Sequence, residues 1–127
     1  MQIDSIDHLV LTVADPAESI RFYTTVLGMT VHTFGSGRTA LLFGSSKINL
    51  HAAGHEYEPK AEKPTPGSAD LCFLVATSIA DVVEELLAAD VPIVEGPVNR
   101  TGATGPILSV YVRDPDDNLI ELSNPTE

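Results

Sequence analysis

The feature that most constrains the fold is an internal repeat. When the 127-residue sequence is aligned with itself so that His8 meets Asp70, residues 8–11 (HLVL) match residues 70–73 (DLCF). With a somewhat longer offset, residues 48–51 (INLH) match residues 118–121 (NLIE). A repeat of this length predicts two supersecondary units with the same fold, joined in tandem.

Each half has the pattern of one strand, one helix and three further strands. In the first half, Asp15 is a helix N-cap, Pro16 takes the first helical position and Gly28 ends the helix. In the second half, Thr77 or Ser78 caps a helix whose apolar residues recur at helical spacing. Alternating and β-branched segments predict strands at 6–13, 30–34, 38–44, 47–52, 69–76, 91–94, 107–113 and 118–123.

The predicted fold class is therefore α+β. Two tandem βαβββ units are expected to form an open, curved, eight-stranded β-cleft flanked by two helices. We expect one domain over residues 1–127, with the first unit at 4–54 and the second at 68–124. The polar, proline-rich segment 55–67 is expected to link them.

Charge and composition limit the partners. The formal net charge of −11 argues against binding to nucleic acid or to an anionic membrane surface. Cys72 is the only cysteine, so an intrachain disulfide is excluded. The sequence has no apolar run of membrane-spanning length and no signal-peptide pattern, so a cytoplasmic location is expected.

The repeat places four metal-compatible residues at matching positions. His8 aligns with Asp70 in the opening strands, and His51 aligns with Glu121 in the closing strands. Two imidazoles and two carboxylates suit a divalent ion, either Ni, Co, Mn, Zn or Fe(II). Since aspartate is short, Asp70 is either a direct ligand or a residue behind the ligands.

Other polar residues have simpler interpretations. His32 is expected to face solvent, His55 lies in the linker, and Cys72 is expected to share a strand face with Asp70. The segment RDPDDN, 113–118, predicts a tight turn. The segment 99–106 predicts a mobile loop in which Arg100 and Thr101 could meet an anionic substrate. Strand alternation makes Phe43, Phe73 and Tyr111 further candidates to line the cleft.

These motifs resemble the vicinal oxygen chelate superfamily, which includes glyoxalase I, extradiol dioxygenases and bleomycin-resistance proteins. The resemblance covers about residues 4–124. The segments KINLH, YEPKA, PGSAD, PVNRTGATGPI and DPDDNLIE are similar to those of the glyoxalase domain-containing protein 5 group. It implies a metal at the bottom of the cleft, held at the positions of His8, His51, Asp70 and Glu121.

The resemblance implies a glyoxalase-type lyase or isomerase whose metal chelates two neighbouring substrate oxygens. In such an enzyme Glu121 and Asp70 are the candidate catalytic carboxylates, one of which transfers a proton at the carbon next to the carbonyl. The order His, His, Asp, Glu departs from the His, Glu, His, Glu of bacterial glyoxalase I, so the resemblance implies the site more closely than it implies one reaction. An extradiol-type dioxygenase using Fe(II) and a non-catalytic small-molecule binding or resistance protein are the alternatives. The resemblance also implies a homodimer. The metal, the substrate and the use of a thiol cosubstrate stay open.

Overall fold

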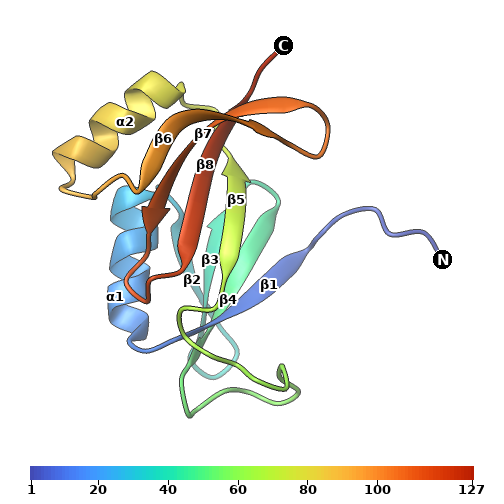
Figure 1. Ribbon diagram of the computed structural model, residues 1–127. Coiled ribbons are helices and arrows are strands. Elements are labelled where there is room, and N and C mark those ends of the chain that lie inside the picture. The colour runs from blue at the N-terminus through green and yellow to red at the C-terminus, as the bar shows by residue number, and fades with distance from the viewer. The chain divides into compact units, whose positions relative to one another are not determined.

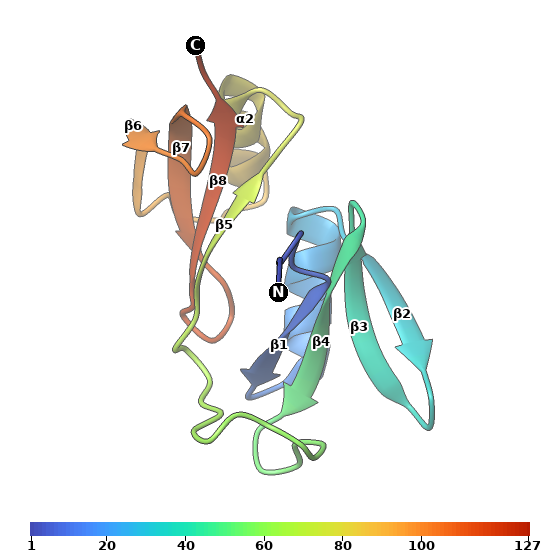
Figure 2. The same ribbon diagram turned by 90° about the vertical axis from the view of Figure 1, so that its right-hand side faces the viewer.

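Each half of the chain forms its own four-stranded sheet. The computed structural model describes residues 1–127 and divides them into two units, Met1–Gly67 and Ser68–Glu127 (Figures 1 and 2). The first unit contains β1 (His8–Val13), α1 (Pro16–Arg21), η1 (Phe22–Val26), β2 (Thr30–Phe34), β3 (Arg38–Phe43) and β4 (Ser46–Ala52). The second contains β5 (Asp70–Leu74), α2 (Ile79–Ala88), β6 (Glu95–Thr101), β7 (Pro106–Arg113) and β8 (Leu119–Pro125).

The two sheets have the same topology. The strand order is β1-β4-β3-β2 in the first and β5-β8-β7-β6 in the second. In each sheet the opening strand runs parallel to the closing strand, and the other pairs are antiparallel. The predicted fold class, α+β with two tandem βαβββ units and two helices, is confirmed, and both sheets are mixed.

One face of each sheet packs into the core of its own unit. In the first unit the buried strand residues are Leu11, Val13, Leu41, Ile48 and Leu50. In the second, β7 and β8 contribute Val110, Val112, Ile120 and Leu122, and α2 contributes Ile79, Val82 and Leu86. Because strand side chains alternate between faces, the remaining residues of each strand lie on the opposite face, which carries the polar candidates.

Both predicted N-caps are present. The Asp15 carboxylate accepts a hydrogen bond from the Ala17 amide at 3.0 Å, and the Ser78 hydroxyl accepts one from the Asp81 amide at 3.2 Å. The first helix continues as the wider η1 turn, in which the Leu27 amide donates to the Phe22 carbonyl. Each cap therefore fixes where the chain leaves the opening strand and enters the helix.

One predicted strand is wrong. Residues 91–94 are irregular, and the strand is β6, which begins four residues later and includes Asn99–Thr101, expected to be loop. Gly96 and Pro97 within β6 hid it, because both residues weaken a strand pattern. Gly96 has φ +107°, and a Cβ there would lie 2.5 Å from the Ser109 carbonyl oxygen. Only glycine fits this irregular pairing with β7.

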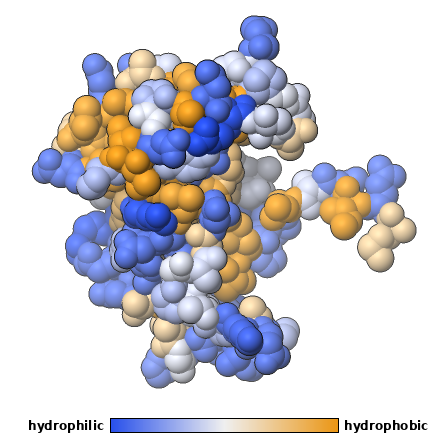
Figure 3. All heavy atoms as spheres, viewed as in Figure 1, coloured by the Kyte–Doolittle hydropathy of each residue, from blue (hydrophilic) through white to orange (hydrophobic).

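Two surface features complete the description. Residues 1–7 extend beyond β1 as an arm on which Met1, Ile3 and Ile6 are exposed, and Figure 3 shows hydrophobic atoms along it. None of the helices is both long enough and apolar enough to span a membrane.

Candidate functional site

The polar face of the first sheet carries both predicted histidine ligands. In the parallel pairing of β1 with β4, His8 is opposite Lys47 and Thr12 is opposite His51. Both histidines therefore lie on the face away from Leu11 and Leu50. They are out of step by four residues, which corresponds to about 13 Å along the strand at ~3.3 Å per residue.

His8 is oriented by its neighbour in the chain. Its imidazole Nδ1 lies 2.8 Å from Oδ2 of Asp7, and 44% of its side chain is exposed. A carboxylate at one ring nitrogen fixes the ring and leaves Nε2 directed away from it, the arrangement found behind many metal-binding histidines. Asp7 was not predicted from the sequence, although it directly precedes His8.

His51 is buried, with 4% of its surface exposed, and its Nε2 has no hydrogen-bond partner. The Tyr57 ring meets it edge-on at 5.4 Å between centroids, and the Arg38 guanidinium lies 4.4 Å from the Tyr57 centroid. Burial lowers the pKa of His51, Arg38 lowers it further, and Glu56 opposes the shift. The ring is therefore neutral near pH 7.

The polar face of the second sheet carries the carboxylates. Asp70 and Cys72 lie on the same face of β5, and Cys72 is paired with Glu121 of β8. Asp70 is exposed, and no hydrogen bond or ion pair holds its carboxylate. The two carboxylates are two residues out of step on neighbouring strands, about 7 Å along the strand direction.

Glu121 is held by two buried serines. Its Oε2 accepts a hydrogen bond from the Ser109 hydroxyl at 2.6 Å and a longer one from Ser123 at 3.4 Å. The two hydroxyls lie 2.7 Å apart, and neither serine is exposed. Since both contact the same oxygen, Oε1 is left for a ligand. Neither serine was predicted as a site residue.

A pocket of about 720 Å³ opens in front of Glu121, within the second unit. It is lined by Cys72, Leu74, Arg100–Ile107, Tyr111, Glu121 and Pro125–Glu127. Its lining combines apolar side chains with a few polar groups, which is typical of small-molecule sites. Arg100, Thr101 and Tyr111, predicted as cleft residues, all line it.

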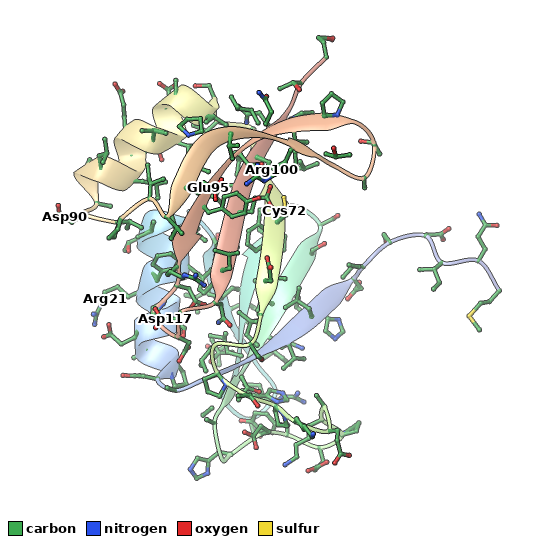
Figure 4. The ribbon with its side chains drawn as sticks, viewed as in Figure 1. Arg21, Cys72, Asp90, Glu95, Arg100 and Asp117 are labelled. Atoms are coloured by element: carbon green, nitrogen blue, oxygen red, sulfur yellow. The ribbon has the colours of Figure 1, made fainter.

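Arg100 is fixed at the wall of this pocket. Its Nε donates to the Tyr111 hydroxyl at 3.0 Å, and its Nη2 donates to Glu95 at 2.9 Å. Figure 4 shows Arg100 and Glu95 together on β6, with Cys72 on β5. The bond to Tyr111 and then the bond to Glu95 raise the pKa of Arg100. The guanidinium is therefore charged, with N–H groups still available to a ligand.

Cys72 lies beside Glu121 on the same wall. Its Sγ is 3.4 Å from the Ser123 hydroxyl. Although Cys72 is accessible to solvent, desolvation raises its pKa, and the Glu121 carboxylate raises it further against the opposing bond from Ser123. The side chain is therefore a thiol near neutral pH.

The other two candidate cleft residues lie elsewhere. Phe43 alternates with Leu42 and shares the face of Leu41, opposite to that of the histidines. Phe73 alternates with Cys72 and lies on the opposite face of β5 from Glu121. The sequence prediction did not fix which of two alternating faces was polar, and for both phenylalanines the structure gives the other one.

The structure also corrects the alignment of the two halves. The Lys47 amide donates to the Asp7 carbonyl, and the Leu119 amide donates to the Ala69 carbonyl. Asp7 and Ala69 correspond as the alignment of His8 with Asp70 predicted. Lys47, however, corresponds to Leu119, whereas the alignment of INLH with NLIE predicted Asp117. The counterpart of Glu121 is therefore Asn49, and the counterpart of His51 is Ser123.

His8 and Asp70 keep their matched positions, whereas His51 and Glu121 do not match. Within neither unit do three or more histidine, cysteine, aspartate or glutamate side chains gather closely enough to hold a metal ion. His8 and His51 come from the first unit, and Asp70 and Glu121 come from the second.

Comparison with known proteins gives a consistent result. Residues 5–122 match the family model described as "Glyoxalase/Bleomycin resistance protein/Dioxygenase superfamily". The chain is 63% identical to virulence protein STM3117 of Salmonella typhimurium, over 97% of this chain and 85% of that protein. It is 60% identical to glyoxalase domain-containing protein RDO1 of Mycosarcoma maydis, over 98% of this chain and 70% of that protein.

Solved structures agree with the sequence matches. The crystal structure of STM3117 is similar with a TM-score of 0.98 and 62% identity, covering 99% of this chain and all of that one. An integron cassette protein from the mobile metagenome of V. cholerae has a TM-score of 0.97 and 54% identity, covering 99% of this chain and 98% of that one. The two-unit architecture is thus shared with experimentally determined relatives.

Proposed function

Because the chain belongs to the glyoxalase/bleomycin resistance protein/dioxygenase superfamily, we propose that it is a divalent-metal-dependent enzyme of glyoxalase type. Its substrate is a small molecule with two neighbouring oxygens, such as the hemithioacetal of an α-ketoaldehyde. We also propose that it belongs to the glyoxalase domain-containing protein 5 group. The KINLH and PVNRTGATGPI segments support this placement, as does the 60% identity to a glyoxalase domain-containing protein.

The proposed metal ligands are His8, Asp70 and Glu121. An imidazole nitrogen with carboxylate oxygens suits Mn, Fe(II), Co, Ni or Zn. Asp7 behind His8 and Ser109 behind Glu121 supply the oriented contacts that metal ligands require. The residue types and their supporting contacts therefore fit a divalent metal.

His51 has a weaker claim as a ligand. It was predicted from an alignment of INLH with NLIE, which the observed strand pairing corrects by two residues. It also lies about 13 Å from His8 along the strand direction. Two side chains that stand side by side on one sheet face do not reach one ion across that distance. The proposal therefore relies on the other three residues.

When bound, the metal supplies a Lewis acid that lowers the energy of negative charge on the substrate oxygens. The side chains supply proton transfer and positioning. Asp70, whose carboxylate has no fixed partner, takes and returns the proton at the carbon next to the carbonyl. Glu121 is held by Ser109 and keeps one oxygen directed at the ligand. Arg100 binds an anionic group of the substrate at the pocket wall.

The observation that carries the proposal is a carboxylate held from behind by a 2.6 Å hydrogen bond while it faces a pocket of about 720 Å³. A surface glutamate needs no such support. Functional carboxylates do, because a ligand must meet them in a fixed orientation.

Metal content and turnover test the proposal. Protein purified without chelator is expected to contain a divalent metal by mass spectrometry, and His8→Ala and Glu121→Ala are expected to lose it. His32→Ala is the matched control, because His32 is an exposed histidine of the same unit outside the proposed centre. Apo protein is then reloaded with each of the five metals and assayed with methylglyoxal and several thiols. No turnover with any metal would refute the glyoxalase-type reaction.

A binding protein is the second candidate. The pocket has apolar walls formed in part by Leu74, Pro106 and Ile107, which suits retention of a small molecule without chemistry. Binding of ligands by chain that contains no metal, with unchanged affinity in His8→Ala, would favour this function. Dimerisation, which the family resemblance implies, stays a prediction that light scattering can test.

A further inference from the structure

The two halves of the chain treat matching polar positions differently. In the second unit, Glu121 and Ser123 on β8 are joined to Ser109 on β7 by hydrogen bonds of 2.6 Å and 2.7 Å. Every member of this cluster has a partner within the same sheet. The second unit thus shows how this position in the fold satisfies buried polar groups by itself.

In the first unit the matching positions are Asn49 and His51 on β4. Asn49 is 8% exposed and His51 is 4% exposed. Asn49 Oδ1 and His51 Nε2 are buried and have no hydrogen-bond partner. The two side chains are two residues apart on one strand, so they stand on the same face.

The missing partner is the counterpart of Ser109. In β3 that place belongs to Arg38, the residue before Thr39, which pairs with Leu50. The Arg38 side chain is directed to aromatic rings instead, 4.4 Å from the Tyr57 centroid and 5.4 Å from that of Phe34. The first unit therefore has no side chain that does for Asn49 and His51 what Ser109 does in the second.

Buried polar atoms without partners are rare in folded proteins, because in the unfolded chain each such atom forms hydrogen bonds with water that it loses on burial. Two of them, side by side on one face, call for a partner from outside the chain. Tyr57, whose ring contacts His51 edge-on, is 39% exposed and lies outside any helix or strand.

We propose that Asn49 and His51 form a ligand-binding pair that recognises a hydroxyl group. An asparagine amide presents an acceptor and donors, and a neutral imidazole presents one of each, so a group that both donates and accepts suits them best. A hydroxyl next to a carbonyl or carboxylate has this property, whereas a dicarbonyl or dicarboxylate lacks the donor. The pair would thereby select α-hydroxy over α-oxo compounds.

The first test needs no ligand. Replacing Asn49 by leucine, which has a similar shape, removes a buried carbonyl oxygen that has no hydrogen-bond partner, so the Tm of the free protein is expected to rise by about 3–8 °C. The matched control is Ser123→Ala at the counterpart of His51, which removes a paired group and is expected to lower the Tm. A fall in Tm for Asn49→Leu would show that the amide is already satisfied, by a buried water for example, and would overturn the proposal.

The second test rests on the proposed metal-dependent function. Calorimetry measures the binding of glycolate, which carries a hydroxyl, and of oxalate, which has no donor, to full-length protein loaded with Mn²⁺. Asn49→Leu is expected to weaken glycolate binding about 10-fold and oxalate binding less than about 2-fold. Equal losses for both probes, no loss for either, or no glycolate binding by unsubstituted protein that contains the metal would overturn the proposal.

Metal content, measured on each sample, separates the two proposals. If Asn49→Leu holds as much metal as the unsubstituted chain, any change in glycolate binding belongs to the pair. If the unsubstituted chain takes up no metal, the proposed function fails, and the two Tm values alone decide whether Asn49 is unpaired.

Discussion

The turn between β7 and β8 depends on one buried carboxylate. Asp114 is 3% exposed, and its Oδ1 accepts hydrogen bonds from the Asp116 and Asn118 amides, each at 2.9 Å. Its Oδ2 accepts a third from the Asn118 side chain at 2.8 Å. The Asn118 Oδ1 in turn accepts from the Ala69 amide at 2.8 Å, immediately before Asp70. Asp114 therefore positions a proposed metal ligand through Asn118.

We predict that Asp114→Ala lowers the free energy of unfolding by about 3–5 kcal/mol, since hydrogen bonds to a charged group contribute about 1.5–3 kcal/mol each. The exposed part of the turn can bind water once the carboxylate is gone, so the three do not add fully. The Asn118 side chain is only 2% exposed and cannot bind water in place of the carboxylate. The cost of leaving it without a partner sets the lower end of the predicted range, at about 3 kcal/mol.

Urea denaturation followed by far-ultraviolet circular dichroism measures this loss. The stability of Asp114→Asn is expected to lie between that of the unsubstituted protein and that of Asp114→Ala. Its one carbonyl oxygen can still accept from the two backbone amides, whereas its NH₂ group cannot accept a hydrogen bond from the Asn118 side chain. Asp117→Asn is the control: Asp117 is exposed with φ +66°, a conformation that asparagine also adopts, and a change below about 0.5 kcal/mol is expected. A loss below about 1 kcal/mol for Asp114→Ala would refute the argument.

Three further predictions concern single side chains. The pKa of His51 is lowered from 6.5, so as the pH falls the unfolded chain binds the proton before the folded chain does. The urea midpoint is therefore expected to fall as the pH drops below 6.5, and to fall less in His51→Phe. An equal pH dependence in both proteins would contradict this. Because the pKa of Cys72 is raised, its alkylation by iodoacetamide at pH 7.5, measured by mass spectrometry, is expected to be several-fold slower than that of glutathione. The Glu121→Gln variant is expected to be alkylated faster than the unsubstituted protein. An alkylation rate that Glu121→Gln leaves unchanged would exclude the carboxylate as a cause of the raised pKa. Gly96→Ala is expected to lower the free energy of unfolding, measured by urea titration, by about 2–4 kcal/mol. Gly44→Ala is expected to lower it by about 1 kcal/mol, because no atom lies within 4 Å of the new Cβ there. Similar losses in the two variants would mean that the backbone relaxes away from the contact with Ser109.

The sequence predicts the order of elements well because its signals are local. Asp15 and Ser78 are caps that act within one helical turn, and both were predicted, the second as one of two candidates. The turn at 113–118 follows from its Asp, Pro and Asn residues, and the structure shows the Asp114 bonds that form it. The strand β6 was missed because Gly96 and Pro97 carry no strand signal, and its pairing is set by β7.

Strand register could not be predicted in the same way. The sequence alignment matched two similar tetrapeptides, INLH and NLIE, by residue character. The hydrogen bonds from Lys47 and Leu119 move the second tetrapeptide by two positions, and this shift replaces His51 by Asn49 as the counterpart of Glu121. Pairing between strands far apart in sequence decides register, and a single sequence contains only its indirect trace.

The closure of each sheet within its own half has a consequence for protein synthesis. All the strand pairs of the first sheet join residues before Gly67, and all those of the second join residues after Ser68. When the ribosome has released the first half, every strand of the first sheet has its pairing partner available before the second half is complete. Loop closure in either half spans at most about 60 residues, so the loop-closure entropy that each half loses is that of a short chain.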